Sequence, residues 1–160
     1  MFWIDVISRI THVSCAIVLV GGAAFQAFAL LPSVSALPDE QRQGFIDRLT
    51  AAWKRFVHVG VLLFLVSGLY NYMQAIPNHK GDGLYHALLG TKMLIALVIF
   101  FLASALVGKS KGLQFIRDKR AMYLKLMLVL ATVIVCISGF AKIRGVPVDD
   151  TTPSAEVSNS

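Results

Sequence analysis

Four long apolar stretches separated by polar segments dominate the hydrophobic pattern of this 160-residue chain. The first runs from Ile10 to Leu31 without a formal charge, and the others cover about residues 56–76, 84–107 and 121–141. A helix needs roughly 20 apolar residues to cross a bilayer core, so each stretch is long enough to cross once. The pattern therefore predicts an all-α fold, an integral membrane four-helix bundle with antiparallel spans.

The polar segments complete the predicted organisation. Residues 77–83 contain proline, asparagine, aspartate and two glycines, which is turn chemistry that joins neighbouring helices tightly. Residues 42–55 carry apolar side chains at helical spacing, which predicts an interfacial helix ahead of the second span. Residues 146–160 have little to bury, and we expect a flexible polar tail there. The bundle itself is assigned to residues 1–145.

Composition and charge agree with a membrane protein. Hydrophobic residues make up 56% of the chain and charged residues 15%, with a net charge of +6. Soluble domains have about 25% charged residues, so much of this apolar surface must face lipid. The basic residues lie between the apolar stretches, which argues against a nucleic-acid partner. Cys15 and Cys136 lie within apolar runs and indicate no disulfide framework.

The distribution of basic residues predicts the orientation of the chain. Two connecting segments, after the first and third apolar stretches, carry most of them: Arg42, Arg48, Lys54, Arg55, Lys109, Lys111, Arg117, Lys119 and Arg120. Basic loops are retained in the cytoplasm. We therefore expect a multi-pass protein of the inner (plasma) membrane with both termini outside, in the periplasm.

Two histidines at similar depth are the candidate metal ligands. His12 lies about one turn inside the outer end of the first span, and His86 lies at the outer end of the third. Imidazoles from facing helices of a bundle can hold haem iron, so we expect them to bind b-type haem near the outer face. Arg9 would pair with a haem propionate. Lys92, roughly 9 Å deeper than His86 along the helix, would contact the macrocycle, a propionate or a buried water.

Small residues could provide a slot for the macrocycle. The first span offers Gly21, Gly22, Ala23 and Ala24, and the third offers Ala87 and Gly90. Together with the histidines they predict a haem protein that acts in electron transfer or haem-linked redox chemistry, with a redox partner or a quinone in the bilayer.

Other roles are open for the same residues. His12 could simply hydrogen-bond to a serine on a neighbouring helix, and His86 could face lipid headgroups. With Met73 and Met93, the two histidines could instead bind Cu(I), although methionine in a membrane helix is more often a filler of gaps. Gln26 lies on nearly the same face of the first span as His12, and we expect an interhelical hydrogen bond from it.

Several motifs resemble those of a known family. His12, Gly21-Gly22 and Leu31-Pro32 resemble the first helix of the copper-resistance D superfamily. Residues 67–71 (SGLYN) resemble its second helix, and residues 90–94 (GTKML) its third, where a lysine is usual. The resemblance covers about residues 8–142 and implies a copper-binding or copper-transporting membrane protein.

The same positions are also similar to the HemJ-type protoporphyrinogen oxidases. These are four-helix membrane proteins that bind haem b and have a first-helix histidine and a third-helix lysine like His12 and Lys92. This resemblance implies oxidation of a porphyrinogen. The chain departs from many copper-resistance D proteins, because it has four spans instead of eight and places Leu19-Val20 where they have a tryptophan before the double glycine.

Overall fold

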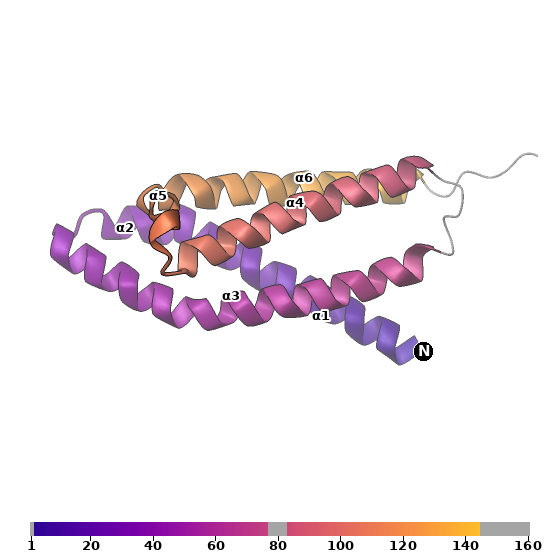
Figure 1. Ribbon diagram of the computed structural model, residues 1–160, viewed down its shortest axis with the longest axis horizontal. Helices are drawn as coiled ribbons and strands as arrows, with labels where there is room; N and C mark the ends of the chain where they lie inside the picture. Colours follow the sequence, from indigo (N-terminus) through magenta and orange to yellow (C-terminus); the bar gives the residue numbers. More distant parts are fainter. Residues whose placement is uncertain (1, 77–82, 145–160) are drawn as a thin grey trace, which may run out of the picture.

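The computed structural model describes residues 2–76 and 83–144, and within these ranges four long helices form a bundle (Figure 1). They are α1 (Phe2–Phe25), α3 (Asp39–Ala75), α4 (Gly83–Val107) and α6 (Arg120–Arg144). A π-helical turn, η1 (Gln26–Leu30), and the short α2 (Leu31–Val34) continue α1, while η3 (Lys111–Leu113) and α5 (Gln114–Asp118) connect α4 to α6. The predicted tail and the predicted turn, apart from Gly83, lie outside the described residues.

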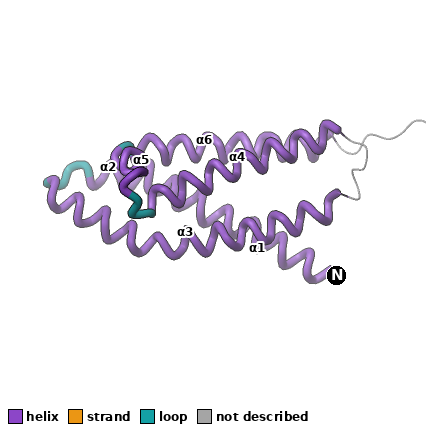
Figure 2. Tube along the Cα trace, viewed as in Figure 1, coloured by secondary structure: helices purple, strands orange, loops and turns teal. Residues whose placement is uncertain are grey.

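The helices pack in a ring. α1 packs on α3, α3 on α4, α4 on α6, and α6 again on α1, with consecutive long helices antiparallel (Figure 1). Figure 2 shows the described loops at one end only, beside α2 and α5; we call this the α5 end and the opposite one the N-terminal end. The buried core lies toward the α5 end and consists of Ala23, Ala27, Leu102, Ala105, Leu106, Ile116, Leu124 and Met127.

The outer faces of the helices remain apolar. Ile17 on α1, Leu94 on α4 and Val135 on α6 are all at least two-thirds exposed, which would be costly in water but suits hydrocarbon. All four long helices are long and apolar enough to cross a membrane. The predicted all-α bundle of four antiparallel, membrane-like helices is confirmed at this level.

Two helices extend beyond the apolar stretches. α1 begins at Phe2 instead of near Ile10, and α3 begins at Asp39 and runs unbroken to Ala75. The segment predicted as a separate interfacial helix, residues 42–55, is therefore continuous with the second span. No proline lies between Asp39 and Ala75, so every backbone N–H can join the helical hydrogen-bond ladder.

The π-helical turn after α1 has a local cause. Pro32 has no backbone N–H, and its ring would clash with the carbonyl four residues earlier in a regular helix. Over this stretch the Leu31 N–H donates to the carbonyl of Gln26, five residues back, which is the spacing of a π-bulge. Helix continues through Val34, and Gln26, the first residue of the bulge, is buried.

Candidate functional site

His12 is held against α3 by three neighbouring residues. Its ring centroid lies 3.9 Å from that of Phe64, and its Nδ1 lies 3.2 Å from Ser67 Oγ. Gly68 lies beneath the ring, because a Cβ at that position would come within 3.0 Å of His12 Cε1. The His12 imidazole on α1 therefore has a defined orientation against α3, although the residue is only half-buried.

The bonds of Ser67 determine which nitrogen of His12 carries the proton. Ser67 Oγ lies 2.7 Å from the backbone carbonyl of Leu63, which can only accept. A hydroxyl has one proton, so it is donated to Leu63 and the oxygen accepts from His12 Nδ1–H. The ring also has the backbone of Phe64 within hydrogen-bonding reach. In the neutral ring with Nδ1–H donated to Ser67, Nε2 is unprotonated. This is the form in which imidazole binds a metal.

The hydrogen bond between His12 and Ser67 is expected both for a structural histidine and for a histidine that binds a metal. It is the interhelical hydrogen bond that a purely structural histidine would make. A histidine that binds a metal also donates its other ring N–H to a neighbouring oxygen, which fixes the tautomer and the orientation of the ring. Ser67 is itself buried, at 5% exposure, so water does not compete for this bond.

On α4, Lys92 is the residue that the fold brings toward His12. Lys92 is half-buried and close enough to act electrostatically on the imidazole. His86 is exposed, and its ring contact is with the neighbouring Tyr85. No hydrogen bond or ring contact in the described ranges joins His86 to His12, so their shared ligation of iron stays a prediction.

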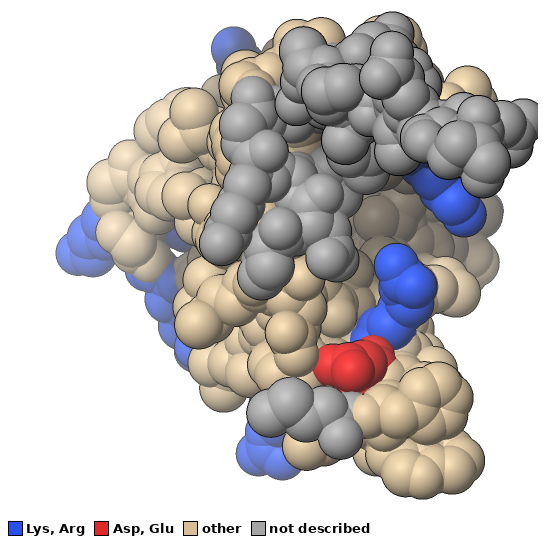
Figure 3. Space-filling view, turned by 90° about the vertical axis from the view of Figure 1, so that its right-hand side faces the viewer, with Lys and Arg blue, Asp and Glu red and all other residues tan. Residues whose placement is uncertain are grey.

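The N-terminal end carries a small polar network beside these residues. Asp5, one turn before Arg9, accepts hydrogen bonds from Tyr70 Oη at 2.7 Å and from Gln74 Nε2 at 3.2 Å. Arg9 is exposed, and Figure 3 shows basic and acidic side chains beside a hollow at this end. The pairing of Arg9 with a propionate stays a prediction.

Both methionines of the copper alternative are exposed on the described helices. Met73 is 62% exposed and Met93 is 39% exposed, as expected for side chains that face lipid. Residues 2–76 and 83–144 contain no group of three or more histidine, cysteine, aspartate or glutamate side chains that could hold a metal ion.

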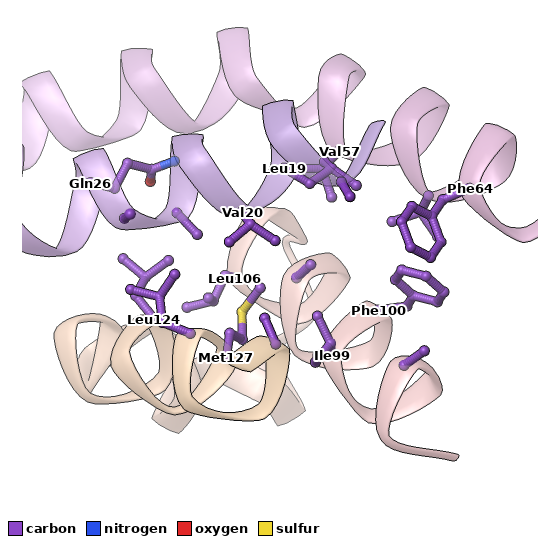
Figure 4. A pocket seen from close by; sticks show the side chains of 18 of the residues that line it. Leu19, Val20, Gln26, Val57, Phe64, Ile99, Phe100, Leu106, Leu124 and Met127 are labelled. Carbon is purple, nitrogen blue, oxygen red and sulfur yellow. The ribbon is translucent and has the colours of Figure 1, made fainter. Parts of the chain in front are cut away.

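An apolar cavity of about 460 Å³ lies between the four long helices. It begins at Ala16 and Ala96, one turn farther into the bundle than His12 and Lys92, and reaches Gln26 toward the α5 end. Figure 4 shows Gln26 and Phe64 at opposite ends of it. Phe64 therefore contacts His12 and lines the cavity as well.

The small residues predicted to form one slot have three different environments. Ala23 and Ala24 line the cavity. Gly22 lies against the indole of Trp53, which a Cβ at that position would overlap, whereas Gly21 and Gly90 have no atom within 4 Å of such a Cβ. Ala87 is exposed. Of these six predicted slot residues, Ala23 and Ala24 alone line the cavity, and Ala87 and Gly90 precede Ala96, where the cavity begins on α4.

The α5 end of the cavity contains a buried arginine. Arg120 is 8% exposed; its Nη1 donates to Thr50 Oγ1 at 2.8 Å and its Nη2 to Gln26 Oε1 at 3.0 Å. The interhelical hydrogen bond expected of Gln26 is confirmed. The sequence placed Arg120 among the basic loop residues, but it is the first residue of α6 and points inward. Nothing in the sequence distinguishes it from the adjacent, exposed Lys119.

Comparisons with protein-family models, curated proteins and solved structures find no match to this chain. What the chain shows is a four-helix protein with long apolar helices of membrane type.

Proposed function

We propose that the protein is a multi-pass inner-membrane protein that binds b-type haem through His12 and acts in electron transfer or haem-linked redox chemistry. The observation that carries this proposal is the bond from His12 Nδ1 to Ser67, which leaves Nε2 available as a ligand. Ionisable side chains are costly within a membrane span and therefore mark functional sites. His12 and Lys92 are two such side chains, and both are half-buried in the described bundle.

The described residues fit a haem in two respects. His12 presents a neutral, oriented imidazole, and the apolar cavity begins one turn away. When bound, haem supplies one-electron redox chemistry. In this proposal His86 would also hold the iron, Arg9 would pair with a propionate, and Lys92 would contact the macrocycle, a propionate or a buried water.

The proposed orientation places the haem near the periplasmic face. The α5 end carries the basic segments and would lie in the cytoplasm, with both termini on the opposite side. Electrons would then pass to or from a redox partner or a quinone in the bilayer. The resemblance to the copper-resistance D and HemJ-type proteins supports a redox or metal role and suggests copper binding and porphyrinogen oxidation as the alternatives.

Visible spectra of the purified protein test the proposal. We expect a Soret band in the oxidised protein and sharp α and β bands after reduction with dithionite. Copper in a metal analysis without these bands would contradict haem binding and favour the copper alternative. Absence of both pigment and metal would favour a structural role for the histidines. Turnover of protoporphyrinogen by haem-loaded protein would favour the HemJ-type enzyme over electron transfer.

Substitution of His86 tests the second ligand. His86→Ala is expected to convert six-coordinate, low-spin iron to a high-spin spectrum, because one axial ligand is lost while His12 still binds. The matched control is His58→Ala, since His58 is also exposed on a long helix but bonds to the Lys54 carbonyl at 2.7 Å toward the α5 end. An unchanged spectrum in His86→Ala would show that another group completes the coordination.

A further inference from the structure

Arg120 places a positive charge in the wall of the apolar cavity. The residue is 8% exposed and lines the cavity, and its Nε is buried without a hydrogen-bond partner in the described part of the chain. An ionised group is expensive to bury unless an opposite charge accompanies it. Native proteins leave few buried donors unsatisfied, so such an atom calls for a partner.

The chain provides neutral partners to this guanidinium. Thr50 and Gln26 each accept one hydrogen bond, so three of its five N–H donors remain. Asp47 on α3 acts on Arg120 electrostatically, but it is exposed, accepts from Gln43 at 3.3 Å, and forms no ion pair with Arg120 within the described ranges. The partial positive charge at the N-terminus of α6 adds to the positive electrostatic potential around Arg120. This end of the cavity therefore attracts an anion.

The rest of the cavity suits a hydrocarbon chain and borders the outer surface of the bundle. Its other walls are almost entirely apolar. Phe28 after α1 and Val135 on α6 line it while being 66% and 69% exposed. The cavity is therefore bordered by side chains that also face outward from the bundle, toward the membrane.

We propose that this cavity binds a long-chain carboxylate from the membrane, with the carboxylate on Arg120 and the hydrocarbon chain between the four helices. Guanidinium and carboxylate groups form strong charge-assisted hydrogen bonds, and Nη1 and Nη2 of Arg120 each keep one N–H beyond the bonds to Thr50 and Gln26. A volume of about 460 Å³ favours one chain over a two-chain lipid. The carboxylate end of this site is distinct from the haem site, because Gln26, which holds Arg120, lies about 21 Å from His12 along the helix.

Trp53 allows binding to be measured directly. Trp53 lines the cavity, whereas the other tryptophan, Trp3, is 73% exposed at the N-terminal end. In the full chain carrying Trp3→Phe, dibromostearate is the probe, since its bromine atoms quench a nearby indole. We expect saturable quenching of Trp53. The uncharged methyl ester of dibromostearate should bind about ten-fold more weakly or worse, because it cannot form the charge-assisted pair.

Substitution of Arg120 tests the role of its positive charge in binding. Arg120→Gln is expected to weaken dibromostearate binding about ten-fold or more and to leave methyl ester binding unchanged. Lys119→Gln is the matched control, because it removes the exposed basic residue that directly precedes Arg120. It should change neither the binding of dibromostearate nor that of the methyl ester. The visible spectrum of the Arg120→Gln protein should stay unaltered, which separates this site from the one at His12.

Three results would overturn the proposal. The first is equal binding of the acid and its methyl ester by the protein with native Arg120, a comparison that holds even if Arg120→Gln does not fold. The second is an equal loss of binding in Lys119→Gln and Arg120→Gln. The third is stronger quenching by a dibrominated phosphatidylglycerol than by the acid, which would assign the site to a two-chain anionic lipid.

Discussion

Replacement of His12 by alanine is expected to remove bound haem almost completely. The Nδ1 bond to Ser67 and the contact with Phe64 orient the His12 ring so that its Nε2 can act as a ligand. His86, the other proposed ligand, is exposed and would hold the haem less firmly on its own. The measurement is the pyridine haemochrome content per mole of purified protein, compared with the unsubstituted chain.

Two further measurements make the His12 result interpretable. Ser67→Ala should keep the ligand but lose its orientation, and loss of such a supporting bond typically lowers metal affinity by about 10–100-fold. Added imidazole should restore haem to His12→Ala protein if the alanine variant is folded and lacks only the ligand. Full haem occupancy in His12→Ala, without imidazole, would remove His12 from the coordination.

Gly22→Ala is expected to destabilise the bundle. A Cβ at Gly22 would overlap the indole of Trp53, so α1 and α3 could not keep their present distance. Overpacking of this kind costs about 1–3 kcal/mol, partly offset by the better helix propensity of alanine, up to about 1 kcal/mol. We expect a net loss of up to about 2 kcal/mol in the free energy of unfolding, measured by denaturant titration in detergent micelles with helix content as the signal.

The neighbouring glycine provides the control. Gly21 lies in the same helix, but a Cβ there meets no atom within 4 Å. Gly21→Ala should therefore leave the stability unchanged or raise it by up to about 1 kcal/mol. Equal effects of the two substitutions would show that the contact of Trp53 with α1 does not hold these helices together.

The fold was largely predictable because a bilayer imposes a simple rule. Every backbone group in hydrocarbon must be bonded internally, so four apolar stretches of sufficient length require four helices. Their lengths were less predictable. α3 continues from Asp39 through the polar residues 42–55 into the second span, since a helix ends where its hydrogen bonds are interrupted and not where its hydropathy changes.

The candidate site was predictable only in part. The cost of placing ionisable groups in a membrane identified His12 and Lys92 from the sequence, and the fold brings these two toward each other. The bond of His12 to a serine was one of the alternatives, and Ser67 is that serine. The joint ligation by His86, the propionate contact of Arg9 and the copper alternative await the spectra and substitutions described above.

By itself the sequence determined the number of long helices and their membrane-like character. It also identified His12, Gln26 and Lys92 as polar side chains that are costly to place within a membrane span. These properties depend on residue type and on position along one helix. Only the tertiary structure decided which side chains meet. Arg120 and Lys119 are adjacent basic residues, yet one is buried against Gln26 and Thr50 and the other is exposed. The difference arises because successive residues at the start of α6 point in different directions, and only the packing of α1 and α3 determines which direction is the interior.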